Sequence, residues 1–123
     1  MIQITKETPA PGIIMFLLKG SLDITTAPEL AQTFRDCFNQ GVYNFIIDLS
    51  QLDYLSRTGA GALVGILPRV EENNGDIVLL QPPPAVEEAL TRLGLSQCFM
   101  ITHNWATALQ ALTSSEDMKY QDS

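Results

Sequence analysis

A short stretch of the chain brings hydroxyl groups, a cation and glycines to the opening of a predicted helix. It comprises Tyr54, Leu55, Ser56, Arg57, Thr58, Gly59, Ala60 and Gly61. The first N–H groups of a helix have no partner within the helix and lie at the positive end of its dipole, so a negative group is stabilised there. Phosphorylation of Ser56 or Thr58 would add about −1.5 to −2 charges at this point and could expel an acidic or apolar partner. The alternative is that one of these hydroxyl groups only caps the helix.

Other reactive side chains form no recognisable catalytic or metal-binding pattern. His103 is the only histidine, and the two cysteines, Cys37 and Cys98, have no metal-ligand spacing. Asp23 and Asp48 are both expected at strand ends, where they could lie near each other, but no nucleophile or apolar cleft accompanies them. We therefore expect a binding protein without a metal or cofactor, not an enzyme.

The composition fits one domain with a substantial core. The chain has 123 residues, of which 46% are hydrophobic and 17% charged. A formal net charge of −7 and only seven scattered Lys and Arg residues disfavour nucleic acid as a partner. No apolar run approaches the ~20 residues that a membrane-spanning helix needs. Two distant cysteines and no signal peptide indicate a cytoplasmic protein.

The first half of the chain predicts two strands and a helix. Alternation over Ile2–Thr5 indicates an edge strand, and the apolar run Ile13–Leu18 indicates a strand buried on both faces. Asp23 then follows a short exit loop from residue 21. Thr26 can cap the next helix while Glu29 reaches back to it. The buried face of this helix is expected to hold Leu30, Phe34, Cys37 and Phe38, with Gly41 in the left-handed position after its last turn.

A central strand and a second helix surround the hydroxyl-rich stretch. The strand is expected at Tyr43–Leu49, with a loop at Ser50–Tyr54 and a helix over Thr58–Glu72. Pro68 should kink this helix because it removes the hydrogen bond to Val64. Gly59 and Gly61 each cost the helix roughly 1 kcal/mol relative to Ala, which suggests that the backbone approaches a neighbour closely there.

The last third predicts two strands, each followed by a helix. The strands are expected at Asp76–Leu80 and Cys98–Ile101, and the third helix begins at Pro84 and stops at Gly94. Asn104 can cap the fourth helix, which would place Trp105, Ala108, Leu109 and Leu112 on one face. Residues 114–123 have no apolar pattern and are expected to form a mobile tail.

The order of elements indicates one α/β domain over residues 1–113. Strands separated by helices pair in parallel, so we expect a mixed, mostly parallel sheet of about five strands with four helices.

Three blocks of the chain carry a family resemblance: residues 20–30, residues 44–63, and residues 75–80 continued by Val86 and residues 93–95. They resemble STAS domains, and most closely the single-domain anti-sigma factor antagonists of bacteria. The resemblance implies a partner, an anti-sigma factor that is a serine kinase of the histidine-kinase-like ATPase type. It also implies a docking and switch surface made of Asp23, Tyr54, Leu55, Ser56, Arg57, Thr58, Gly59 and Gly61.

The chain departs from the family at the phosphorylated position. The family signature reads Asp, two Ser or Thr residues, then Gly, and its first hydroxyl residue is phosphorylated. Laid onto this chain, Ser56 stands at the Asp, Arg57 at the phosphorylated residue and Thr58 at the second hydroxyl, while Gly59 matches. Because Arg57 cannot accept phosphate, the switch is either moved to Thr58 or Ser56 or absent.

Two other functions remain open at this point. The chain could be a STAS subunit of another assembly, such as a lipid-transport ATPase or a stress-signalling scaffold. It could instead sense a small anion or nucleotide held by Arg57 and the helix N-terminus. Whether the chain forms a homodimer is also open.

Overall fold

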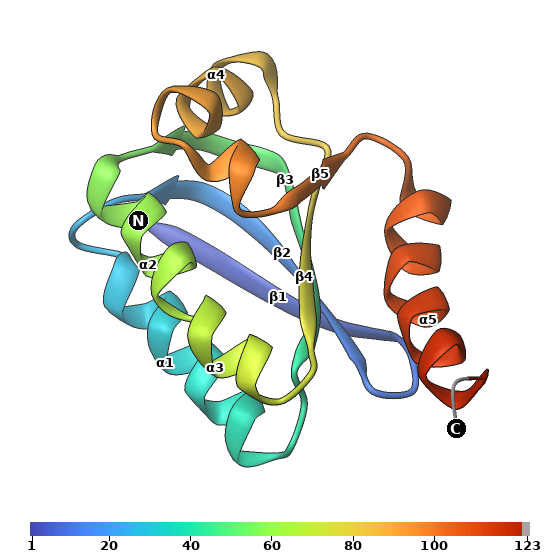
Figure 1. Ribbon diagram of the computed structural model, residues 1–123. Helices are drawn as coiled ribbons and strands as arrows, with labels where there is room; N and C mark the ends of the chain where they lie inside the picture. The colour runs from blue at the N-terminus through green and yellow to red at the C-terminus, as the bar shows by residue number, and fades with distance from the viewer. Residues whose placement is uncertain (122–123) are drawn as a thin grey trace.

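A five-stranded sheet runs through the middle of the molecule (Figure 1). The computed structural model describes the backbone of residues 1–121 and the side chains of residues 1–113. The strands are β1 (Ile2–Ala10), β2 (Ile13–Leu22), β3 (Asn44–Leu55), β4 (Asp76–Leu80) and β5 (Met100–Thr102), and they lie side by side in that order. β1 pairs antiparallel with β2, and the other neighbours pair in parallel. The predicted α/β class, the mostly parallel sheet and the edge position of the first strand are confirmed.

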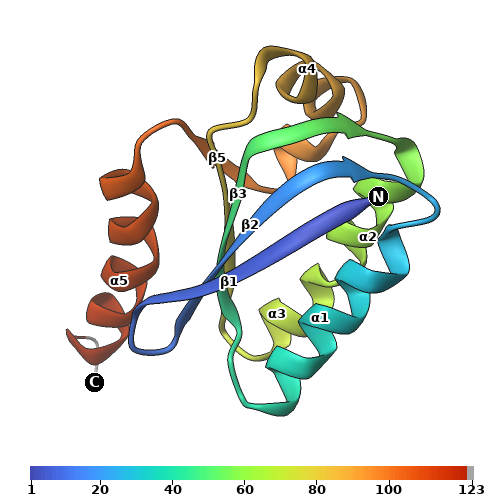
Figure 2. The same ribbon diagram turned by 180° about the vertical axis from the view of Figure 1, so that it is seen from behind.

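Helices cover both faces of the sheet, but unequally (Figure 2). One face carries α1 (Ala27–Asn39), α2 (Arg57–Gly65), α3 (Leu67–Glu72) and α4 (Pro84–Arg92), followed by a 3₁₀ turn, η1 (Leu95–Gln97). The other face carries α5 (Trp105–Gln121). The carboxyl ends of β2, β3, β4 and β5 all meet at one edge of the sheet, where the loops that lead to these helices gather.

Two hydrophobic clusters hold the layers together. The larger lies between the sheet and α1–α4 and centres on Phe16, Phe34 and Phe45, whose rings are fully buried and meet edge-on at centroid distances of 5.0 and 5.5 Å from Phe34. The predicted buried face of α1 is confirmed, and burial raises the pKa of the Cys37 thiol within it. The smaller cluster joins the sheet to α5 through Ile13, Ile46, Val78, Leu80, Ala108 and Leu112.

β3 is longer than the sequence predicts, because the loop expected at Ser50–Tyr54 is strand. Leu52 and Leu55 are buried, and β3 stays paired with β2 through two register irregularities up to the Leu22–Leu55 pair. Residues 21 and 22 of the predicted exit loop are also strand, because they pair with Tyr54 and Leu55 of β3.

This longer pairing also corrects the predicted proximity of two carboxylates. Asp48 pairs with Leu17, whereas Asp23 follows Leu22. Leu17 and Leu22 are five residues apart along β2, which corresponds to about 16 Å of strand. Asp48 accepts a hydrogen bond from the Ser50 N–H at 2.9 Å instead. The two acids therefore cannot cooperate in acid–base chemistry.

The helix predicted over residues 58–72 is two helices with a break at Ile66. Pro68 lies in the first turn of α3, where its missing N–H costs nothing. The interruption expected from Pro68 is therefore confirmed. Further on, Gly94 has a φ of 84° and leads into η1, whose Leu95 is buried. This turn moves the last strand to Met100–Thr102, later than predicted.

α5 begins as predicted, because the Asn104 Oδ1 accepts a hydrogen bond from the Thr107 N–H at 2.9 Å. Ala108 and Leu112 are buried against the sheet, whereas Trp105, at the start of the helix, is 39% exposed. The tail expected at residues 114–123 stays a prediction, since residues 122 and 123 lie outside the described part and the helix reaches Gln121. No helix in the described residues is long and apolar enough to span a bilayer.

Candidate functional site

Ser56 is the N-cap of α2. Its backbone is extended, and its Oγ accepts a hydrogen bond from the Gly59 N–H at 3.0 Å. Its carbonyl accepts the first helical bond, from the Ala60 N–H at 2.8 Å. The capping alternative therefore holds for Ser56, and the helix starts one residue earlier than predicted, at Arg57.

The first turn of α2 rests directly on the end of β2. The Ser56 N–H donates to the Leu22 carbonyl at 3.0 Å. A Cβ added at Gly59 would overlap that carbonyl oxygen and lie 2.7 Å from its carbon, so only glycine fits. The close approach predicted for Gly59 is confirmed. The same prediction is wrong for Gly61, where an added Cβ would meet no atom within 4 Å.

A compact turn follows β2 and leads into α1. The Asp23 carboxylate accepts hydrogen bonds from the Thr25 N–H at 3.0 Å, the Thr25 hydroxyl at 2.6 Å and the Thr26 N–H at 3.2 Å. These bonds lower the pKa of Asp23 from its ordinary value, the Thr25 hydroxyl contributing most, while desolvation opposes them. The turn thus holds its carboxylate ionised.

Thr26 does not cap α1 with its side chain, contrary to the sequence prediction. Its hydroxyl donates to the Ser21 carbonyl at 2.8 Å and accepts from the Asp23 N–H at 2.9 Å. The hydroxyl is therefore used to close the turn after β2. The Thr26 N–H donates a hydrogen bond to the Asp23 carboxylate.

Three apolar side chains are exposed near this junction, one on the turn after β2, one on β3 and one on α2. Ile24 is 71% exposed, Tyr54 57% and Val64 37%. Tyr54 pairs in register with Ser21 near the end of β2, so the loop that carries Ile24 lies beside it. We call these three residues, with the exposed Arg57 and Thr58, the open edge. Leu55, which the sequence also suggests for docking, is 3% exposed and supports this surface from below.

Arg57 has no carboxylate within ion-pair distance among the side chains of residues 1–113. The Asp23 carboxylate accepts the Thr25 hydroxyl, and the Asp48 carboxylate accepts the Ser50 N–H. A cavity of about 210 Å³ lies beside Arg57 and is otherwise lined by Ala60, Gly61, Val64, Leu93 and Leu95. The open edge thus combines exposed apolar surface with an uncompensated cation.

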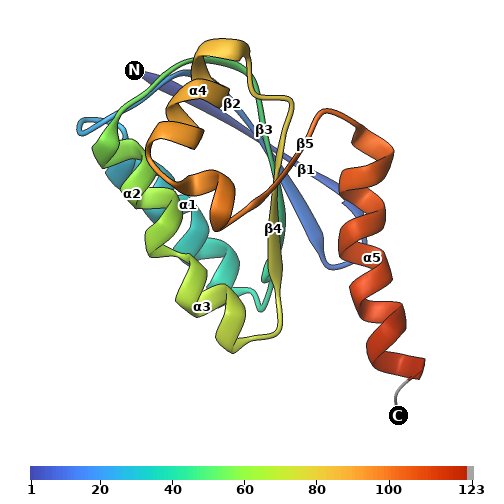
Figure 3. The same cartoon turned by 45° about the horizontal axis from the view of Figure 1, so that its top comes forward.

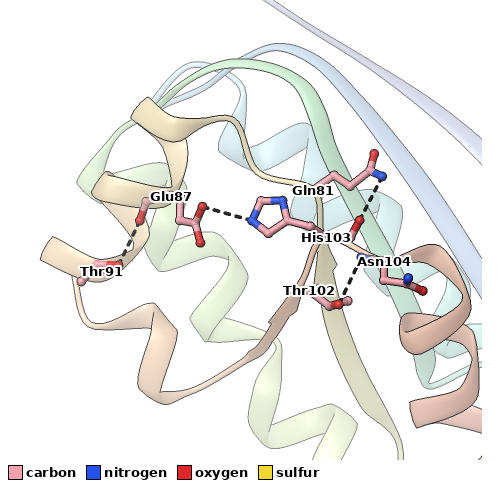
Figure 4. Close-up of polar contacts among 6 residues, drawn as sticks. All are labelled: Gln81, Glu87, Thr91, Thr102, His103 and Asn104. Atoms are coloured by element: carbon pink, nitrogen blue, oxygen red, sulfur yellow. Dashed lines mark hydrogen bonds and ion pairs between the residues drawn. The ribbon is translucent and has the colours of Figure 1, made fainter.

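A second polar cluster lies where β4 and β5 end (Figure 4). The His103 Nε2 lies 3.1 Å from the Glu87 Oε1, and the Gln81 side-chain amide donates to the His103 carbonyl at 3.3 Å. The sequence predicts an exposed loop histidine, and the ring is indeed 58% exposed, but its partner was missed. The signal was available, because Glu87 and His103 follow adjacent parallel strands. No group of three possible metal ligands occurs among the described residues.

Comparison with known proteins identifies the family. The family model for the STAS domain matches residues 5–108. The chain belongs to the STAS domain family. The match to this STAS domain model includes every residue of the open edge, from Ile24 to Val64.

Relatives of this STAS domain carry names from one regulatory system. An anti-sigma-B factor antagonist of Staphylococcus epidermidis is 30% identical over 74 residues, which are 60% of this chain and 65% of that protein. The match thus spans about two thirds of that relative. A candidate anti-sigma factor antagonist of Bordetella bronchiseptica, BtrV, is 22% identical over 104 residues, or 85% of this chain and 90% of that protein.

The same fold occurs in solved STAS structures. The crystal structure of an anti-sigma factor antagonist from Mycobacterium paratuberculosis matches with a TM-score of 0.81, covering 92% of this chain and 95% of that one. The two sequences are 23% identical, so this likeness establishes the STAS fold alone.

Proposed function

We propose that this STAS protein is an anti-sigma factor antagonist, a regulator of sigma-factor-dependent transcription that works by binding an anti-sigma factor. The observation that carries the proposal is the open edge, where Ile24, Tyr54 and Val64 are exposed and Arg57 has no ion-pair partner among the side chains of residues 1–113. Exposed aromatic and aliphatic side chains beside an arginine are the chemistry that dominates protein–protein interfaces. The names of the relatives supply the kind of partner.

The cavity beside Arg57 favours a protein partner over a small anion or nucleotide. Its other lining residues, Ala60, Gly61, Val64, Leu93 and Leu95, are apolar, and Arg57 is its single cation. A phosphate normally gathers several donors or cations, whereas an apolar side chain fits such a lining without leaving a polar group unpaired. Titration calorimetry with ATP, GTP and inorganic phosphate tests this choice, because binding of any of them would favour the sensor function.

A phosphorylation switch, where one operates, is assigned to Thr58. Thr58 is exposed and its hydroxyl makes no hydrogen bond among the described residues, whereas the Ser56 Oγ is engaged by the Gly59 N–H. A phosphate on Thr58 would lie in the first turn of α2, where the helix dipole favours it, and next to Arg57. It would mask the cation and weaken contact with an acidic partner.

The binding test uses the purified protein and the purified anti-sigma factors of its host. The wild-type protein is expected to bind one of them in titration calorimetry, and Ile24→Ala with Tyr54→Ala should weaken that binding at least tenfold. Met100→Ala is the matched control, because Met100 is 41% exposed at β5, away from the open edge. If no anti-sigma factor binds the wild-type protein, the proposed function is wrong.

The switch is tested separately with ATP and the kinase that binds. Mass spectrometry should place phosphate on Thr58, and Thr58→Ala should abolish it while Ser56→Ala does not. Phosphate on neither residue would leave a constitutive antagonist and remove the switch. The proposed role places the protein in the cytoplasm, which a fluorescent fusion would test.

A further inference from the structure

Two glycines of α2, Gly61 in its interior and Gly65 at its last residue, contact no described atom that would exclude a side chain. Gly61 and Gly65 lie one helical turn apart on the same face, and both are exposed. A Cβ added at either would meet no atom within 4 Å. Glycine in a helix interior is less stable than alanine. Unlike Gly59, which must avoid Leu22, these two glycines destabilise the helix without relieving any contact in the described structure.

A groove runs along each side of this glycine face. One, of about 320 Å³, separates α2 and α3 from α1, which lie side by side in Figures 1 and 3. It is lined by Ala31, Arg35, Phe38, Ala62, Gly65, Ile66 and Arg69. The other is the cavity of about 210 Å³ between α2 and the corner that joins α4 to η1. α2 therefore forms a low ridge between two depressions.

The charge of these grooves is opposite to that of the protein. Their linings hold three arginines, Arg35, Arg57 and Arg69, and no carboxylate, in a chain with 14 acidic and seven basic residues. Arg69 lies over the Phe38 ring at 5.5 Å, and Arg35 donates to the Gln32 side-chain carbonyl at 2.8 Å. No ion pair within the described residues neutralises them. Such a surface is complementary to an acidic partner.

We propose that the exposed face of α2 is the seat for an acidic helix of a partner protein. Gly61 and Gly65 let the partner helix approach closely, and the grooves on both sides accept the side chains that flank the contact. Its Asp or Glu side chains pair with Arg35, Arg57 and Arg69. A second copy of this chain fits less well, because a two-fold interface would bring the same three arginines together. The proposal rests on the proposed function only for the identity of the partner.

The first test adds two methyl groups to the glycine face. Gly61→Ala with Gly65→Ala should raise the thermal unfolding midpoint by about 4–8 °C, because alanine favours the helix and meets no obstruction. The same variant should bind the partner at least tenfold more weakly. A more stable variant with unchanged affinity would overturn the proposal, and the measured midpoint excludes misfolding as the cause of lost binding.

The second test removes the cations and keeps a matched control. Arg35→Gln with Arg69→Gln should weaken binding at least tenfold and reduce its dependence on salt concentration. Lys6→Gln with Arg92→Gln removes two exposed cations outside both grooves and should leave binding unchanged. Equal effects of the two double substitutions would mean that only the net charge matters, which contradicts the proposal.

The third test identifies the occupant. A photoreactive amino acid in place of Ala62 is cross-linked to the anti-sigma factor that the wild-type protein binds or, where none binds, in a lysate of the native host. Mass spectrometry should find an acidic segment of another protein. A basic segment, a second copy of this chain or no cross-link would overturn the proposal. An acidic segment of some other protein would support the seat and remove the proposed function. An anti-sigma factor that binds the glycine variant as tightly as the wild-type protein would support the proposed function and overturn the seat on α2.

Discussion

Two groups of loops at the same edge of the sheet use their polar side chains differently. The loops after β2 and β3 satisfy their backbone with Asp23 and Ser56, yet leave the open edge without partners in the chain. At the ends of β4 and β5, by contrast, His103 pairs with Glu87, and Gln81 bonds the His103 carbonyl. The loops after β2 and β3 have a hydrogen-bonded backbone, but the side chains of the open edge have no partners among the described residues. At the ends of β4 and β5 the polar side chains bond to groups of the same region.

This difference indicates where a partner can gain most. A surface whose backbone is already ordered loses little entropy on binding, and its exposed apolar side chains and free cation gain new contacts. At the β4 and β5 ends, a partner would first have to replace the hydrogen bond between His103 and Glu87. The following predictions test this contrast, from the largest expected effect to the smallest.

Gly59→Ala should push the first turn of α2 away from the end of β2. Its Cβ would overlap the Leu22 backbone, which cannot move without disturbing β2, so the free energy of unfolding should fall by about 1–3 kcal/mol. Urea denaturation followed by circular dichroism measures the loss. Gly61→Ala is the control, with an expected gain of up to about 1 kcal/mol, and the same sign for both variants would contradict the contrast.

Ser56→Ala should remove the N-cap of α2. The Gly59 N–H would lose its acceptor, and the expected loss in unfolding free energy is about 1 kcal/mol. Thr58→Ala, whose hydroxyl has no partner in the described structure, should change stability by less than about 0.5 kcal/mol. If the two variants proved equally stable, Ser56 would not be the cap.

Asp23→Ala should cost stability in a pH-dependent way. The folded chain lowers the pKa of Asp23 below its ordinary value of 3.8, so its contribution is present above that pH and is lost as pH falls through the folded pKa. The difference in unfolding free energy between wild type and variant should therefore be constant from pH 5 to 7 and shrink below about pH 4. A difference that does not shrink as the pH is lowered through the acidic range would contradict the ionised turn.

His103→Ala should have the smallest effect. Its ring and the Glu87 side chain are 58% and 45% exposed, and ion pairs at such positions contribute about 0–1 kcal/mol. We expect a loss of less than about 0.5 kcal/mol at pH 7 and unchanged affinity for the partner. A tenfold loss of affinity would show that the β4 and β5 ends belong to the interface.

Local rules account for much of the fold. The caps at Ser56 and Asn104 were readable because short polar side chains precede helical periodicity, and the break near Pro68 follows from its missing N–H. The end of β3 was not readable, since the segment Ser50–Tyr54 is mostly polar. Its strand conformation depends on pairing with residues of β2 some thirty positions earlier in the chain.

Gly59 and Gly61, at the start of α2, show where local sequence rules stop and tertiary packing takes over. The sequence alone indicated the STAS family and a helix that opens close to Ser56 and Thr58. It could not distinguish Gly59 from Gly61, because both are the same residue in the same helical turn. Residues two apart on a helix point about 200° apart, so only the packing of α2 on β2 decides which meets Leu22 and which faces solvent. Tertiary packing likewise leaves Arg57 without a carboxylate partner among the side chains of residues 1–113, and the Asp23 carboxylate bonds within its own turn.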